Sequence, residues 1–178
     1  TYTERFGKEG AYITKATAQL MRDFGSVQSP QSAFYLNLGL ESLHVRMARH
    51  CENALAVAKF LKESDKISWV KYAGLEGDED YPLASKYLKN GTCGVVSFGV
   101  KGGRAAAEEF MRRLKIIAIE THVADARSCC LHPASTTHRQ MNDEELVNAG
   151  VSPDLVRLSC GLENSADLID DIKQALGE

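Results

Sequence analysis

Clusters of positive charge are missing from this sequence. Its 178 residues include 21 Lys and Arg against 24 Asp and Glu, for a formal net charge of −3, and no basic block is hidden inside that average. Nucleic acids and anionic membranes are bound through clustered Lys and Arg side chains. We therefore expect neither nucleic acid nor membrane among the partners of this protein.

Long apolar runs are missing as well. The longest of them span only a few residues, whereas a helix needs about 20 apolar residues to cross a bilayer. The first residues, Thr1–Arg5, do not form the charged-then-apolar pattern of a secretory signal. These absences predict a cytoplasmic protein.

The sequence has no C-x-x-C motif, and its five cysteines are an odd number. A disulfide framework needs paired cysteines, so we expect reduced and mostly buried thiols. No metal site is expected either, because the spacing of His132 and His138 lies outside the usual zinc spacings, and the adjacent Cys129 and Cys130 are poorly placed to bind one ion together. The stretch LHPASTTHRQ, residues 131–140, is instead predicted to be an irregular loop whose hydroxyl and imidazole groups satisfy one another.

The apolar content that is present suffices for one core. Hydrophobic residues make up 44% and charged residues 25% of the chain, which at this length suits one domain, or one domain with an arm. A helix-forming run begins at Gly10 and ends at Gly25, since glycine commonly terminates helices. Ser29 and Pro30 predict the cap and first turn of a second, short helix through Leu36.

The remaining residues alternate between strand and helix patterns. From Ser42 onward, apolar residues recur every three or four positions, which predicts an amphipathic helix that packs on a sheet. Its apolar stripe comprises Leu43, Met47, Cys51, Leu55, Ala58 and Leu61. Strands are predicted at 67–74, 93–103, 115–120 and 154–161, with a possible short strand at 128–132, and helices at 104–114, 142–150 and 163–176. We expect an α+β two-layer sandwich, a roughly four-stranded sheet covered by helices, with a leading helical arm.

Arg157 is the most informative residue of the last predicted strand. Alternation along DLVRLSCG places it on the face opposite to Val156 and Leu158. An arginine in an apolar strand needs a carboxylate or phosphate to pair with its fork of N–H donors. A ligand could supply that anion. Spacing alone favours the alternative of a solvated sheet face or an internal salt bridge to Glu163 or Asp154.

Three long segments together resemble the C-terminal part of the Cys/Met metabolism enzymes that depend on pyridoxal phosphate (PLP). They are TYTERFG at residues 1–7, the run MRDFGSVQSPQSAFYLNLGLESLHVRMARHCENALAVAKFL at 21–61, and the run from ADARSCCLHPASTTHRQ to DDIKQAL at 124–176. The resemblance covers nearly the whole chain. Within the family it is strongest to O-acetylhomoserine sulfhydrylases. Methionine γ-lyase and the cystathionine synthases and lyases are the alternatives.

The resemblance implies a large PLP-binding domain followed by a smaller α+β domain that closes over an amino acid substrate. Residues 1–41 would then be a helical connecting arm from a PLP-binding domain missing here, and residues 42–178 the C-terminal α+β domain. The intact enzyme would be a homotetramer that replaces the acetate of O-acetylhomoserine by sulfide or a thiol. The alternative outside the enzymes is a free-standing α+β binding or regulatory module.

The resemblance also assigns roles to individual residues. Arg157 matches the arginine that clamps the substrate α-carboxylate, and Ser128 matches a serine that helps to position the substrate and the catalytic lysine.

Family members hold PLP as a Schiff base on a lysine of the large domain. Lys15 follows a threonine, as the PLP-binding lysine of the family can, but Lys15 matches the connecting helix. We therefore do not expect Lys15 to bind PLP. The chain alone is therefore expected to contain no catalytic residue, to bind no PLP or metal and to be inactive. Relatives often have Gly-Gly-x-Glu-Ser-Leu where this chain has residues 124–129, ADARSC, so Ser128 matches while its neighbours differ.

Overall fold

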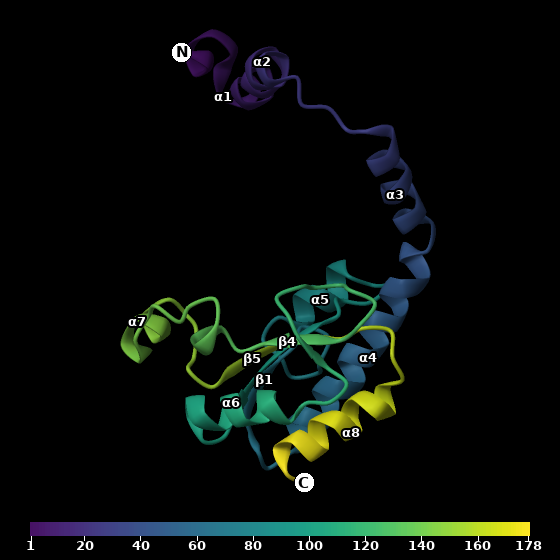
Figure 1. Cartoon of the computed structure of the whole chain (residues 1–178), viewed down its shortest axis with the longest axis vertical. Coiled ribbons are helices and arrows are strands. Elements are labelled where there is room, and N and C mark those ends of the chain that lie inside the picture. Colours follow the sequence, from purple (N-terminus) through teal and green to yellow (C-terminus); the bar gives the residue numbers. More distant parts are fainter. The chain divides into compact units, whose positions relative to one another are not determined.

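The chain divides where helix-only sequence gives way to alternating strands and helices. The computed structural model describes all 178 residues and contains two compact units, Thr1–Ser42 and Leu43–Glu178 (Figure 1). None of its helices combines the length and the apolar character that crossing a membrane requires.

The first unit is helical throughout. It consists of α1 (Tyr2–Lys15), the π-helix η1 (Ala16–Met21), α2 (Arg22–Phe24) and α3 (Pro30–Glu41). The predicted helix end is confirmed at Gly25, which adopts the left-handed conformation (φ 66°) that glycine tolerates. Ser29 caps α3 as predicted, because its Oγ accepts the Ser32 N–H at 3.1 Å. The helix continues beyond the predicted end at Leu36, since no proline follows to stop it.

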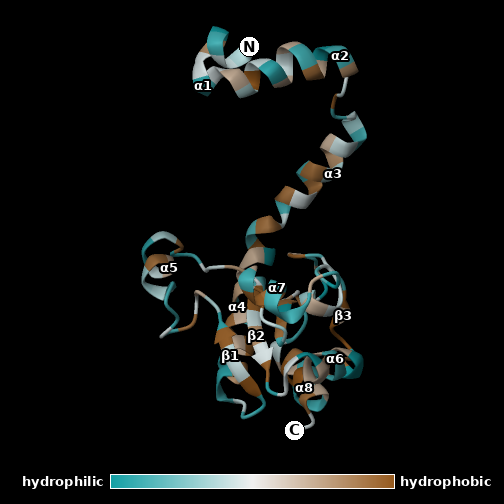
Figure 2. Cartoon of the chain, turned by 90° about the vertical axis from the view of Figure 1, so that its left-hand side faces the viewer, coloured by the Kyte–Doolittle hydropathy of each residue, from teal (hydrophilic) through white to brown (hydrophobic).

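No side chain of the first unit is buried. Apolar residues appear as brown bands along α3 in Figure 2, and Phe34, Leu36 and Leu40 are 61%, 61% and 62% exposed. A helix that is apolar around most of its circumference is typical of one that is enclosed by further protein.

The second unit is built on a five-stranded sheet in the order β1-β2-β5-β4-β3. The strands are β1 (Ile67–Lys71), β2 (Val95–Val100), β3 (Ala118–Ile119), β4 (Cys129–Leu131) and β5 (Leu155–Ser159). All neighbours are antiparallel except β3 and β4, which are parallel. The strand β5 is therefore central and hydrogen-bonded on both sides.

Three helices form the second layer: α4 (Leu43–Glu63), α6 (Gly103–Arg113) and α8 (Ser165–Leu176). Helix α4 contacts β1 and β2, α6 contacts β2 and β5, and α8 packs on α4 and α6. Three short helices complete the unit, α5 (Tyr81–Tyr87), the 3-10 helix η2 (Pro133–Ser135) and α7 (Asp143–Asn148). The predicted α+β sandwich is confirmed, and the possible short strand is real and becomes β4.

The buried face of α4 differs from the predicted stripe. Leu43 is 37% exposed, and Cys51 and Leu55 are only partly buried. The residues that are buried are His50, Asn53, Ala54, Val57, Ala58 and Leu61. The prediction failed at the start of this face because two polar side chains occupy it. A pattern of hydropathy does not predict that polar side chains are buried.

Candidate functional site

Arg157 projects from the middle of the central strand. On β5 it pairs in register with Ser97 of β2 and Leu131 of β4. Its neighbours along the strand, Val156 and Leu158, are buried in the core beneath the helices. Alternation therefore directs Arg157 to the opposite face, where it is partly exposed, as the sequence predicts.

The guanidinium of Arg157 is held by a backbone carbonyl and by no carboxylate. Its Nη2 donates to the Thr121 carbonyl oxygen at 2.7 Å. The alternative of an internal salt bridge is wrong: the Glu163 carboxylate is bonded to Ser128, and the Asp154 carboxylate to Ser68 and Ser152. A guanidinium has five N–H donors, so Arg157 keeps donors that can bind an anion.

The segment 120–128 runs beside the C-terminal end of β5 and is fastened to it. The Ala124 N–H donates to Ser159 Oγ at 3.0 Å, and the Leu162 N–H donates to the Ala126 carbonyl at 2.8 Å. We call this segment, which also contains Thr121, the clamp loop. Through it, the partner of Arg157 is tied to the strand that carries Arg157.

Ser128 ends the clamp loop and is fully buried. Its Oγ donates to Glu163 Oε2 at 2.8 Å and accepts the Gly161 N–H at 2.7 Å, while its own N–H donates to Glu163 Oε1 at 2.6 Å. The proton of the hydroxyl is thus used inside the protein. Ser128 and Arg157 share no hydrogen bond, and in this arrangement Ser128 fixes the loop.

Two buried side chains of α4, which the sequence reasoning missed, support the connection between β5 and α8. His50 Nδ1 lies 2.6 Å from the Cys160 carbonyl oxygen, and Asn53 Nδ2 donates to the carbonyls of Gly161 and Glu163 at 2.9 and 2.8 Å. The only signal in the sequence is that two polar residues three positions apart interrupt an apolar helix face. Buried polar groups at such positions generally satisfy a backbone.

The loop at 131–140 satisfies part of its polar groups itself, as predicted, and Pro153 outside the loop supplies a further partner. His132 is buried, with Nε2 2.8 Å from the Pro153 carbonyl oxygen and Nδ1 2.8 Å from Ser135 Oγ. A carbonyl only accepts, so Nε2 carries a proton. Thr136 Oγ1 donates to the His132 carbonyl at 2.8 Å. No three His, Cys, Asp or Glu side chains of the chain are grouped so that they could hold a metal ion.

The five cysteines are all unpaired thiols. Burial raises the pKa of the Cys130 and Cys160 thiols to about 12. Burial also raises the pKa of Cys129, with Glu120 and Asp125 adding to the effect. A nucleophilic cysteine needs a lowered pKa, so these three thiols are not activated.

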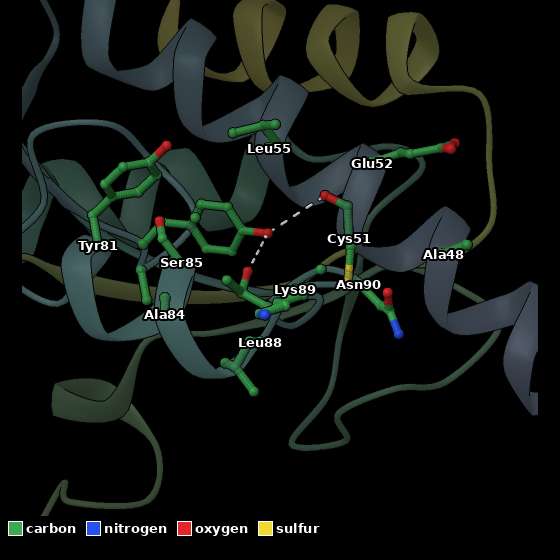
Figure 3. A pocket seen from close by; sticks show the side chains of 15 residues that line it. Ala48, Cys51, Glu52, Leu55, Tyr81, Ala84, Ser85, Leu88, Lys89 and Asn90 are labelled. Atoms are coloured by element: carbon green, nitrogen blue, oxygen red, sulfur yellow. Dashed lines mark hydrogen bonds between the residues drawn. The ribbon is translucent and has the colours of Figure 1, made fainter.

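A cavity of about 500 Å³ lies between α4 and α5 (Figure 3). The Tyr72 hydroxyl on its wall donates to the Cys93 carbonyl at 3.0 Å and accepts from Thr92 Oγ1 at 2.9 Å. Burial raises the pKa of this phenol to about 12. Arg157 and Ser128 do not line this cavity, and its principal polar group is already satisfied within the protein.

Lys15 is exposed at the end of α1, in the unit without buried side chains. It borders a surface hollow whose other lining residues are Thr1, Tyr2, Thr3, Ala11 and Tyr12. PLP sites pair the pyridine nitrogen with an acidic or arginine side chain, and this hollow offers neither. The residues around Lys15 therefore do not fit PLP.

Known proteins resemble the chain over nearly its whole length. The model of the family described as "Cys/Met metabolism PLP-dependent enzyme" matches residues 7–177. The homocysteine synthase of Schizosaccharomyces pombe is 44% identical over 98% of this chain and 41% of its own length. The O-acetyl-L-homoserine sulfhydrylase of Leptospira meyeri is 45% identical over 93% of this chain and 38% of its own.

A solved structure agrees with these sequence matches. A Campylobacter jejuni protein described as an O-acetylhomoserine (thiol)-lyase superposes with a TM-score of 0.84 and 38% identity, over 94% of this chain and 40% of its own. That protein carries N'-pyridoxyl-lysine-5'-monophosphate at its position 205. The chain thus spans about two fifths of the length of the relatives it matches.

Proposed function

The chain belongs to the Cys/Met metabolism PLP-dependent enzyme family, and from this premise we propose that it is the C-terminal, substrate-closing domain of an O-acetylhomoserine sulfhydrylase. The names of the relatives support the activity, and the two-fifths coverage supports the assignment to one part of a longer enzyme. The enzyme would replace the acetate of O-acetylhomoserine by sulfide, releasing homocysteine and acetate.

The observation that carries the proposal is the open guanidinium of Arg157. It is fixed by Thr121 on one side, lacks a protein carboxylate and stands on a strand that is bonded on both edges. A planar fork of this kind matches a carboxylate through two parallel hydrogen bonds. In the proposal Arg157 binds the α-carboxylate of the substrate and orients its Cα–H bond, which is a positioning role.

The proposal places the cofactor outside this chain. PLP supplies the electron sink of the family's reactions, and Lys15 and the other residues described above have no part in holding it. The chain alone would therefore be inactive.

The first unit supports a larger assembly. Most of the stability of a helix in a protein comes from packing, because isolated helices are only marginally stable in water. The helices of the first unit bury no side chain, and α3 exposes apolar residues along its length. In the proposal, residues 1–41 are the arm that packs against a PLP-binding domain. The intact enzyme would be a cytoplasmic homotetramer.

The test is kinetic and uses the longer polypeptide that the proposal requires, in which this chain follows a PLP-binding domain. It should form homocysteine from O-acetyl-L-homoserine and sulfide, and Arg157→Ala should raise the KM for O-acetyl-L-homoserine strongly. Loss of a charge-assisted bidentate pair costs roughly 2 to 4 kcal/mol, or about 30- to 900-fold in kcat/KM.

The matched control is Arg112→Ala, since Arg112 is an exposed arginine of α6 that pairs only with Glu109. It should leave the kinetics unchanged. An unchanged KM for Arg157→Ala would remove Arg157 from the site. Release of a keto acid and ammonia in place of homocysteine would assign a γ-lyase instead, and a start codon immediately before the codon for Thr1 would favour a free-standing module.

A further inference from the structure

Glu163 joins the clamp loop to the connection between β5 and α8. Its two carboxylate oxygens accept from the N–H and the hydroxyl of Ser128 at 2.6 and 2.8 Å. The same hydroxyl accepts the Gly161 N–H. One carboxylate therefore closes a hydrogen-bonded ring of three residues at the end of the strand that carries Arg157.

The backbone of Glu163 is fixed independently of its side chain. Asn53 on α4 donates to the carbonyls of Glu163 and Gly161, and His50 lies against the Cys160 carbonyl. Helix α4 thus anchors the connection, and the carboxylate projects from an anchored backbone toward Ser128.

The loop and the strand also touch closely at Gly161. A Cβ at this position would lie 2.5 Å from the Ala126 carbonyl oxygen and 2.5 Å from the Arg127 carbonyl carbon. Such distances are well inside van der Waals contact, so the clamp loop rests directly on the backbone of the connection. Four sets of hydrogen bonds join this part of the loop to β5 and the connection after it: Ser128 to Glu163, Gly161 to Ser128, Leu162 to Ala126 and Ala124 to Ser159.

We propose that Glu163 is a positioning residue that sets the orientation of Arg157 through the clamp loop. The path runs from the Glu163 carboxylate to Ser128 at one end of the loop, and from the Thr121 carbonyl at the other end to Arg157 Nη2. Glu163 makes no ion pair with Arg157, so it directs the guanidinium without neutralising the charge that a substrate carboxylate needs. This inference rests on the proposed role of Arg157.

The test observes the Arg157 side chain directly, by NMR on the full 178-residue chain labelled with ¹⁵N. In the parent chain, the contact with Thr121 should slow the rotation of the Arg157 guanidinium and give it resolved Nη signals. Glu163→Ala should abolish these signals and reduce hydrogen-exchange protection of the Ser128 N–H at least tenfold. Glu163→Gln keeps one carbonyl oxygen to accept the Ser128 N–H, and it should restore most of both effects.

Glu109→Ala is the matched control, because this glutamate of α6 also makes two short contacts, with Arg112 and Arg113. It should leave Arg157 unchanged. Resolved Arg157 signals in Glu163→Ala, with Ser128 protection lost, would overturn the proposal and leave Glu163 as a loop tether. Should Glu163→Ala not fold, Ser128→Ala takes its place, and ordered Arg157 signals in that variant would equally contradict the proposal.

This measurement is separable from the kinetic test of the proposed function. An unchanged KM in Arg157→Ala would overturn the substrate role of Arg157. The NMR signals would still show whether Glu163 orients that side chain.

Discussion

Ala124, in the clamp loop, adopts a backbone conformation that favours glycine. Its φ of 58° is the single positive value outside the glycines of the chain. The left-handed region costs a residue with a Cβ atom roughly 1 to 2 kcal/mol, and the greater entropy of glycine in the unfolded chain offsets part of that difference. Ala124→Gly should therefore raise the free energy of unfolding by about 0.5 to 1 kcal/mol, measured by urea denaturation.

Ala105→Gly is the control for this prediction. Ala105 is exposed on α6, where glycine should lower the free energy of unfolding by about 1 kcal/mol. If both substitutions destabilise the chain equally, Ala124 is not strained.

Asp171 is a second residue whose side chain we expect to contribute strongly to the stability of the fold. It is 3% exposed, and its carboxylate accepts the N–H groups of Lys115, Ile116 and Ile117, each at 2.9 Å. Asp171→Ala leaves these donors without an acceptor, at about 1 kcal/mol or more each, so we expect a loss of roughly 3 kcal/mol in urea unfolding. The neighbouring Asp170 is exposed, and Asp170→Ala should cost under about 0.5 kcal/mol. Similar losses from the two variants would contradict this account.

At the scale of single residues, the sequence predicted the face of the strand on which Arg157 lies, but not its hydrogen-bond partner. Alternation along a strand is a local property, so it correctly placed Arg157 on the face opposite to Val156 and Leu158. Its actual partner is the Thr121 carbonyl. Every residue has a carbonyl, so nothing in the sequence distinguishes that of Thr121. Glu163 and Asp154 were candidates because they carry the opposite charge and are near in sequence.

Among the elements, β1 is tied to the start of β5 across β2. The Asp154 carboxylate accepts from Ser68 Oγ at 2.7 Å and from the hydroxyl of Ser152 and the indole of Trp69. It passes over Gly99 of β2, where a Cβ would collide with both Asp154 and Trp69. Burial by itself would raise the pKa of Asp154, but the hydrogen bonds outweigh it and lower the pKa below its ordinary value.

This pKa shift predicts a pH dependence of stability. The folded pKa lies below that of the unfolded chain, about 3.9, so the ionised carboxylate stabilises the fold above this value, and the contribution is lost as the pH falls through the folded pKa. Asp154→Asn should lower the free energy of unfolding at pH 7 by roughly 1.5 kcal/mol. The difference from the parent chain should shrink below about pH 4. A difference that is independent of pH, in urea titrations from pH 7 to pH 3, would contradict this assignment.

The elements themselves were largely predictable, and their detailed packing was not. Caps such as Ser29 and stops such as Gly25 are local signals, and both are confirmed. The rotation of α4 depends instead on carbonyls of residues 160–163, more than 100 positions away, which His50 and Asn53 satisfy. Long-range pairing of this kind leaves no periodicity in the sequence.

At the scale of the whole molecule, the proposal that the cofactor binds elsewhere can be tested on the chain alone. PLP added to the 178-residue chain, followed by borohydride reduction and peptide mapping, should modify Lys15 no more than Lys8. Both lysines are exposed on α1, and neither pairs with a group that would favour a Schiff base at neutral pH. Stoichiometric modification that is confined to Lys15 and disappears in Lys15→Ala would show that this helix does hold the cofactor.

The central place of β5 has a consequence for engineering. Both edges of this strand are hydrogen-bonded, and Val156 and Leu158 fill the core beneath it. In the proposed enzyme, a mutant library aimed at new substrates would gain little by varying the strand, because most substitutions there would prevent folding. The useful diversity lies at exposed positions of the clamp loop such as Val123 and Arg127, where substitutions can reshape the surroundings of the arginine while its anchor stays in place.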